Sequence, residues 1–227
     1  MSSQRYKMAH RGASIMRRLL ISTACVATTT ILAAAGTQSS IKGDRAVVVL
    51  DNARVRVFKT LGSSLAGVEH RAGVVIALED GRTTKAGEAF WAADAGVQTE
   101  RLGADASSLI IVEPKDVAAG ATPAPEAGSK PGEAVFTGMS FKTLFENEKV
   151  TALRARMEVD AREGFHTHGS DTLVVHLSGG AIEDTAEGKT SVNRWKRGDV
   201  EFEARGSSHS ARNVGPAVDV VLVVLKP

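Results

Sequence analysis

The fold of this chain is decided by a stretch that begins Gly164-Phe165-His166-Thr167-His168 and closes with Gly206-Ser207-Ser208-His209. In an extended strand, residues i and i+2 point to the same face of the sheet. His166 and His168 therefore direct two imidazole rings towards one point. A second predicted strand runs into the glycine turn at Gly206, which presents His209 as a third ring. Three imidazoles that leave positions open for water or substrate suit zinc, iron, manganese, nickel or copper.

The spacing around the third histidine resembles the second sequence motif of the cupins. In that motif a glycine is followed by Pro-x-Gly, then by histidine and asparagine. The chain matches it at Gly198, Gly206, His209 and Asn213, with Ala204 in the place of the proline.

The first cupin motif is also present, with two departures from the family pattern. It is matched at His166, His168 and either Gly179 or Gly180. Asp160 stands where the opening glycine belongs, and Thr172 or Leu173 stands where the glutamate ligand belongs.

The resemblance implies an all-β fold of double-stranded β-helix (jelly-roll) barrels, with a divalent metal held by His166, His168 and His209. It leaves open whether the ion is Fe, Mn, Zn, Ni or Cu. Asp171, next to the expected glutamate position, is the candidate for a fourth ligand; the alternative is a turn residue that bonds its own backbone. His176 shares the strand parity of the other histidines, but its apolar neighbours favour a core or pocket-lining role.

Two further strands can be oriented from their side-chain patterns. Apolar Val200 and Phe202 alternate with Glu201 and Glu203, so the apolar side is expected to face the core and the glutamates to point outward. Val218–Leu225 is almost entirely apolar and is expected to be a strand that is buried on both sides.

An internal repeat predicts two domains. The first copy keeps one imidazole, His70, opposite His168, and is therefore expected to be a degenerate cupin domain at 42–113. A segment rich in Ala, Pro and Gly forms the predicted linker 114–135, and 136–227 is the predicted metal-binding cupin domain. The matching segments are LDNARV (Leu50–Val55) with FENEKV (Phe145–Val150), VVIALEDG (Val74–Gly81) with TLVVHLSG (Thr172–Gly179), Gly87–Trp91 with Gly198–Phe202, and Ser108–Glu113 with Val218–Val224.

Residues 1–35 have the anatomy of a secretory signal peptide. Met16-Arg17-Arg18 precedes an uncharged run that ends in Ala33-Ala34-Ala35 before Gly36, a pattern of small residues typical of a cleavage site. We therefore expect a periplasmic or secreted protein. The rival interpretation, a membrane anchor, is disfavoured because the run is short and rich in Ser and Thr.

Removal of this leader changes the charge balance. The leader holds five basic residues and no acidic ones, which leaves 23 basic and 26 acidic residues and changes the net charge from +2 to −3. Nucleic-acid binding is therefore not expected. The leader also contains Cys25, the only cysteine, so the mature chain has neither a disulfide nor a thiol nucleophile.

Three hypotheses of function follow from the sequence. The chain is an exported metal-dependent enzyme acting on a small oxygen-rich or carboxylate substrate, a non-catalytic binder of a metal or small ligand, or a purely structural pair of barrels. The sequence identifies no catalytic acid or base. An enzyme should present a charged or hydrogen-bonding wall to the metal, whereas a structural protein should fill that space with apolar side chains. Strand-edge pairing is expected, either in a homodimer or between the two copies.

Overall fold

The fold is built from β-strands. A computed structural model of the chain describes residues 45–61, 72–93, 108–116 and 135–226. The regular secondary structure in these ranges consists of β-strands alone, which confirms the predicted all-β class. All of the strand pairs are antiparallel. Within the same ranges, no helix could cross a membrane. The predicted leader and His70 lie outside the described residues.

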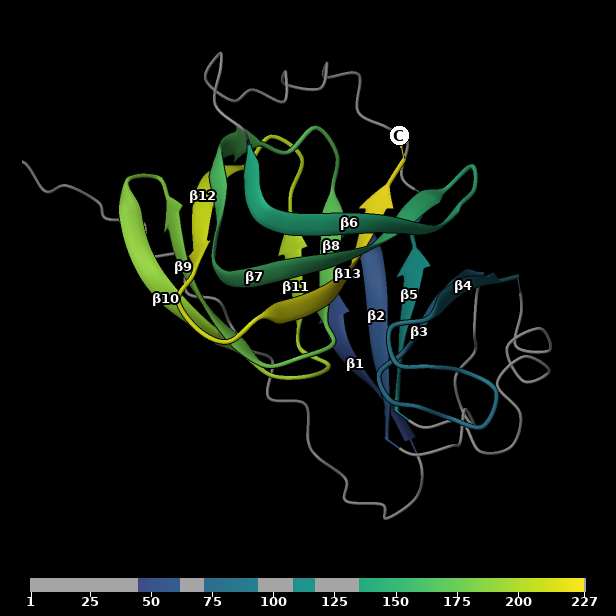
Figure 1. The fold of residues 1–227 in the computed structure, drawn as a ribbon. Coiled ribbons are helices and arrows are strands. Elements are labelled where there is room, and N and C mark those ends of the chain that lie inside the picture. Colours follow the sequence, from purple (N-terminus) through teal and green to yellow (C-terminus); the bar gives the residue numbers. More distant parts are fainter. Residues whose placement is uncertain (1–44, 62–71, 94–107, 117–134, 227) are drawn as a thin grey trace, which may run out of the picture. The chain divides into compact units, whose positions relative to one another are not determined.

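The first copy of the repeat forms a five-stranded sheet (Figure 1). The strands lie in the order β1-β2-β5-β3-β4. Their bounds are β1 (Arg45–Asp51), β2 (Val55–Leu61), β3 (Gly73–Ala77), β4 (Ala89–Ala92) and β5 (Leu109–Pro114).

The second copy forms an eight-stranded sheet that curls around a cavity. The strands lie in the order β10-β9-β12-β7-β13-β8-β11, and β6 pairs with β7. Their bounds are β6 (Phe136–Glu146), β7 (Val150–Thr167), β8 (Thr172–His176), β9 (Gly180–Ala186), β10 (Lys189–Trp195), β11 (Val200–Glu203), β12 (Ser208–Asn213) and β13 (Val218–Leu225).

The strand order of the first sheet recurs within the second. The order β1-β2-β5-β3-β4 has its counterpart in β6-β7-β13-β8-β11. The first hairpin turns are also alike. The side-chain oxygens of Asn52 and Asn147 each accept hydrogen bonds from the backbone N–H groups two and three residues later, at 2.8 to 2.9 Å. Such asparagine turns supply in the side chain what a backbone carbonyl would otherwise provide.

The backbone corrects the register of the predicted repeat by one residue. The Ala77 N–H donates to the Glu88 carbonyl, and the His176 N–H donates to the Asp199 carbonyl. Glu88 and Asp199 are equivalent in the repeat, so Ala77 corresponds to His176. The predicted alignment of Val74–Gly81 with Thr172–Gly179 is therefore displaced by one position.

The second copy has strands that the described part of the first copy lacks. Between β3 and β4, residues 78–88 contain turns and no strand, whereas the hairpin β9–β10 fills the corresponding interval between β8 and β11. The described residues of the first copy thus form one sheet rather than a closed barrel. The domain boundaries 42–113, 114–135 and 136–227 stay a prediction.

Both copies contribute to one hydrophobic core. On β8, Leu173 and Val175 are fully buried in a cluster that also contains Val57 and Ile76 of the first copy. The apolar face of β11 packs against the same cluster. Strand β13 divides its apolar side chains between the shared core and the cavity. Strand β13 therefore has one face in the hydrophobic core and the other face against the cavity, which explains why it is apolar on both sides.

A shared core predicts that the two copies unfold together. Leu173→Ala and Ile76→Ala are each expected to lower the free energy of unfolding by about 3 kcal/mol, because each leaves a cavity at a fully buried site. Urea unfolding followed by circular dichroism should show one cooperative transition for both variants. Val192→Ala, at a 47% exposed position, is the control and should cost less than about 1 kcal/mol. Two separate transitions, with Ile76→Ala moving only one of them, would contradict a common core.

Candidate metal centre

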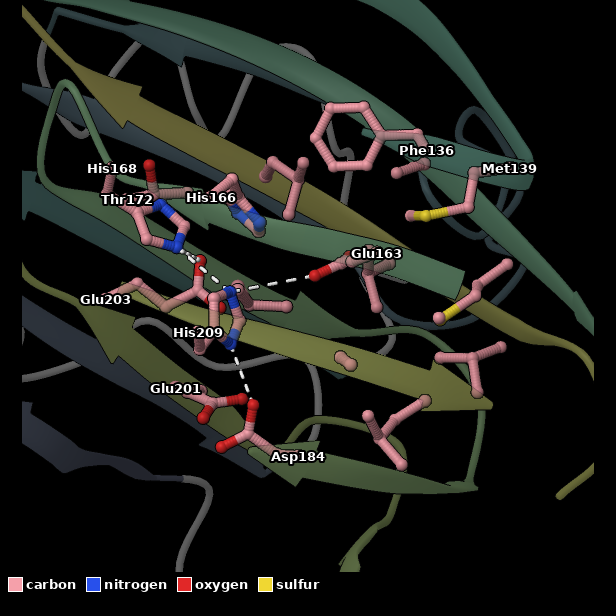
Figure 2. Close-up of a pocket in the computed structure, with 18 of the residues that line it drawn as sticks. Phe136, Met139, Glu163, His166, His168, Thr172, Asp184, Glu201, Glu203 and His209 are labelled. Atoms are coloured by element: carbon pink, nitrogen blue, oxygen red, sulfur yellow. Dashed lines mark hydrogen bonds and ion pairs between the residues drawn. The ribbon is translucent and has the colours of Figure 1, made fainter. Parts of the chain in front are cut away.

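The three predicted ligand histidines meet at one end of the cavity. Strands β7 and β12 place His166 directly opposite His209, and the backbone N–H of His168 donates to the Ser207 carbonyl at 2.9 Å. One ring nitrogen from each histidine lies within 4.8 Å of those of the other two (Figure 2). The Nε2 atoms of His168 and His209 are 3.1 Å apart. This arrangement is the one the two strand spacings predicted.

Hydrogen bonds on the outer ring nitrogens orient two of the imidazoles. His166 donates from Nδ1 to the Gly164 carbonyl at 2.9 Å, and His209 donates from Nδ1 to the Asp184 carboxylate at 2.8 Å. A neutral ring that donates from Nδ1 leaves Nε2 as a free acceptor, so both rings offer a lone pair to the centre. The sequence analysis missed Asp184, which is on β9 and outside both motifs.

Four carboxylates surround the histidine triad. The Glu203 carboxylate lies 3.6 Å from Nε2 of His168, and the Glu163 carboxylate lies 3.7 Å from Nε2 of His209. Figure 2 shows both pointing towards the rings, with Glu201 and Asp184 beside them. These side chains give the cavity a strongly acidic end.

Burial governs the protonation of this acidic end. Burial first, and then the charges of Glu163, Glu201 and Asp184, raise the pKa of Glu203 to about 8. Burial likewise raises the pKa of Glu163 and of Glu201. Burial, with smaller contributions from His209 and His166, lowers the pKa of His168 to about 4. The low-dielectric site thus disfavours charge on each of these groups.

The expectation that Glu201 and Glu203 point outward was wrong. Both line the cavity, while Val200 and Phe202 on the other face of β11 pack against the core shared with the first copy. The strand alternation was correct, but the apolar side faces the other sheet and the polar side faces the barrel interior. A pair of glutamates two residues apart, next to a histidine motif, is the signal that could have indicated this.

The Asp171 carboxylate is bonded to partners other than the triad histidines. It accepts from Nε of Arg54 at 2.7 Å and from the backbone N–H of Arg205 at 2.8 Å. Among the described residues, the group able to hold a metal comprises the three histidines without Asp171. The contact with Arg54 links the two copies instead.

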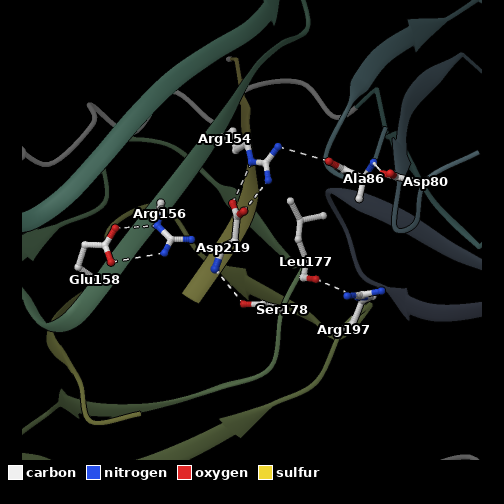
Figure 3. A network of polar contacts seen from close by, with 9 residues as sticks. All are labelled: Asp80, Ala86, Arg154, Arg156, Glu158, Leu177, Ser178, Arg197 and Asp219. Carbon is white, nitrogen blue, oxygen red and sulfur yellow. Dashed lines mark hydrogen bonds and ion pairs between the residues drawn. The ribbon is translucent and has the colours of Figure 1, made fainter. Parts of the chain in front are cut away.

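A second polar contact between the copies involves Arg154. Its guanidinium pairs with Asp219 through Nε at 2.9 Å and Nη2 at 2.5 Å, and also donates to the Ala86 carbonyl at 3.3 Å (Figure 3). Hydrogen bonding to Asp219 is the main cause that raises the pKa of Arg154. Ion pairs and hydrogen bonds thus reinforce the apolar contacts across this interface.

The cavity has a volume of about 440 Å³ and a mostly apolar wall. The apolar lining comes chiefly from β6, β7 and β13 and includes Phe136, Met139, Leu153, Met157, Val220 and Leu222. The described residues that line the cavity include no lysine or arginine. The space is therefore suited to a molecule with an apolar body and a polar group at the triad.

His176 lines the cavity as well, on the same face of β8 as Thr172 and Val174. It is 3% exposed, and its ring stacks on Trp195 with centroids 4.5 Å apart and planes inclined by 15°. Both ring nitrogens lack a hydrogen-bond partner. Burial lowers the pKa of His176 to about 4, against a smaller opposing effect of Asp199. The pocket-lining role considered from the sequence agrees with this position.

Comparison with solved structures yields proteins that are similar to about two fifths of this chain. A cupin domain from Bordetella pertussis Tohama I is 21% identical, covering 40% of this chain and 95% of that chain, with a TM-score of 0.37. A predicted oxalate decarboxylase from Thermotoga maritima is 25% identical, covering 39% and 81%, with a TM-score of 0.33. The polyketide cyclase RemF from Streptomyces resistomycificus is 16% identical, covering 41% and 69%, with a TM-score of 0.36.

One of these structures is described as a cupin domain, the family that the sequence motifs resemble. No protein-family profile and no curated protein sequence matches the chain. Of the three structures, two are described by an enzymatic activity and one only as a cupin domain.

The buried state of His176 predicts a pH-dependent stability. Its pKa of about 4 in the folded protein is below the value of about 6.5 in an unfolded chain, so the unfolded chain binds the proton more readily between these values. The contribution of His176 to stability is thus lost as the pH falls from 6.5 towards 4, by up to about 3 kcal/mol.

Chemical unfolding of the wild type and His176→Phe at several pH values measures this effect. The difference between the two proteins isolates His176, because His168 and Glu203 titrate in both. The wild type should lose more stability than the variant as the pH falls. Parallel pH profiles would contradict a buried, neutral His176.

Proposed function

We propose that this protein is a metal-dependent enzyme of the cupin type, in which His166, His168 and His209 hold a divalent transition metal. The observation that carries the proposal is the convergence of three imidazoles with several carboxylates at one end of an open, otherwise apolar cavity. A divalent metal bound there would supply Lewis-acid polarisation of a substrate oxygen or lower the pKa of a bound water.

The donor set fits such an ion. Three neutral imidazoles suit zinc, iron, manganese, nickel and copper, and one ring nitrogen of each histidine lies within 4.8 Å of those of the other two. The Asp184–His209 contact has the carboxylate–histidine form that orients metal ligands in many proteins. Burial raises the pKa of the nearby Glu203, Glu163 and Glu201, and a bound cation would favour their ionised forms.

We propose that Glu203 takes the role of the glutamate that the first cupin motif lacks. Of the two possible positions of that glutamate, Thr172 lines the cavity and Leu173 lies in the core. Glu203 is paired directly opposite Thr172 across β8 and β11. Side chains of directly opposed residues project from the same face of the sheet. A carboxylate on the neighbouring strand therefore reaches the same region of space. Glu163 is the other candidate, from the strand that also carries His166.

The cavity lining narrows the class of substrate. A carboxylate substrate would find no lysine or arginine among the described lining residues, and it would lie close to four acidic side chains. The apolar wall instead favours a small molecule with an apolar body that approaches the metal through an oxygen atom. We therefore propose a neutral substrate in preference to the carboxylate first expected from the sequence.

The cavity lining also helps to decide among the enzymatic, binding and structural hypotheses. A structural role predicts a filled interior, whereas this cavity holds about 440 Å³ and has hydrogen-bonding groups at the triad. Its predominantly apolar wall leaves a second candidate function, a binding protein that retains a small ligand without turnover. Product analysis after incubation of the metal-loaded protein with candidate ligands distinguishes the two.

Metal content is the primary test of the proposed site. We expect roughly one transition-metal ion per chain by inductively coupled plasma mass spectrometry, and its loss in a His166→Ala/His168→Ala double variant. Lys189→Ala, on an exposed part of β10, is the control and should retain the metal. If the folded wild type neither contains nor takes up Fe, Mn, Zn, Ni or Cu, the proposed function is wrong.

The same measurement separates the two glutamates near the triad. Glu203→Gln should weaken metal binding by on the order of 10- to 100-fold, whereas Glu163→Gln, which is matched in chemistry, should have a smaller effect. If Glu163→Gln weakens metal binding more than Glu203→Gln does, Glu163 rather than Glu203 is the ligand.

We also propose that the protein is exported and acts in the periplasm or outside the cell. The support is the basic start, the apolar run and the small residues before Gly36. Intact mass spectrometry of protein made in a bacterial host with its own leader should show a chain that begins at Gly36 in the extracytoplasmic fraction. An uncleaved chain in the cytoplasm would contradict export.

A further inference from the structure

We propose that His176 forms a second recognition point in the cavity, which hydrogen-bonds a neutral donor–acceptor group at the end of the ligand remote from the triad. The inference rests on the proposed function, because it describes the molecule that the same cavity accepts. It identifies that molecule as elongated, with a metal-binding oxygen at one end, an apolar middle and a hydroxyl or carboxamide at the other.

The position of His176 follows from the alternation along β8. Thr172, Val174 and His176 line the cavity, while Leu173 and Val175 point into the shared core. Thr172 lies opposite Glu203, at the triad end of the cavity. His176 lies four residues after Thr172 along the extended strand, a distance of about 13 Å. His176 is therefore remote from the metal site but faces the same space.

The polar atoms of His176 are left without partners. One ring face is covered by Trp195, and neither nitrogen has a hydrogen-bond partner although the residue is 3% exposed. A buried polar atom without a partner is costly, and an apolar side chain would fill this place at a lower cost. A ligand that supplies the missing hydrogen bonds would account for the presence of histidine here.

The chemistry of the ring indicates a neutral partner. A neutral imidazole offers one N–H donor and one nitrogen acceptor, which matches a hydroxyl or a carboxamide. The lowered pKa of His176 is consistent with a neutral ring at physiological pH. An anionic group would gain no ion pair there and would share the cavity with Glu201. Val220 pairs with His176 across the sheet, and Val174 and Leu222 extend the wall towards the triad.

The test compares hydroxamates as probes of both ends of the cavity. Acetohydroxamic acid is a metal-binding head alone. A longer alkyl hydroxamate with a terminal hydroxyl, and its methyl-terminated counterpart, extend the head over about 13 Å. Binding of each probe to the nickel-loaded full chain is measured by calorimetry for the wild type, His176→Phe and His176→Gln.

A hydroxyl left unpaired in an apolar site binds poorly. The preference for the hydroxyl-terminated probe over the methyl-terminated one should therefore fall by on the order of 10-fold in His176→Phe. His176→Gln keeps a donor and an acceptor and should retain part of the preference. Acetohydroxamic acid should bind all three proteins equally. An unchanged preference in both variants would overturn the inference and make His176 a core residue stacked on Trp195.

A measurement on the metal-free protein keeps this test separate from the test of the proposed function. In the metal-free protein, 1-hexanol should shift the ring nitrogen NMR signals of His176 saturably, and hexane should not. If the protein binds no metal but shows this shift, the proposed function fails and the recognition point remains. Acetohydroxamic acid could bind while the longer probes show no dependence on His176 and 1-hexanol does not shift its signals. In that case the recognition point is wrong and the proposed metal site stands. Thermal unfolding of both variants establishes that they are folded.

Discussion

The structure depends on strands whose two faces are buried in different surroundings. On β8, β11 and β13, one face packs into the core shared with the first copy, and the other lines the cavity. Alternation along a strand assigns side chains to opposite faces, so the same few residues build the interface and the site. Leu173 and Val175 stabilise the sheet from one side. Thr172, Val174 and His176 are thereby held at fixed positions on the other.

In the proposed metal centre, a residue outside the first motif offers the carboxylate that the motif lacks. The first motif has no glutamate at Thr172, but Glu203, 31 residues later in the sequence, is paired directly opposite Thr172. A search for the cupin pattern along the sequence shows only that the glutamate is missing. The pairing of the strands reveals that an acidic side chain lies in the same region.

The sequence predicted those features that depend on short-range geometry. The spacing of His166 and His168 and the glycine turn before His209 predicted the triad, and their resemblance to the cupin motifs implied the fold class. The inward direction of Glu201 and Glu203 depends on what covers the other face of β11, and no local pattern contains that information. Asp171 likewise looked available until Arg54, more than a hundred residues earlier, was found beside it.

The interface between the copies has a consequence for how the protein responds to dilution. Two separate chains joined by such a face would come apart at low concentration, as any dissociable pair does. Here the partners are segments of one polypeptide, so their local concentration is set by the connecting chain and is unaffected by dilution. A protein released into a large volume would thus keep its barrel supported, with Leu173 and Ile76 still in one core.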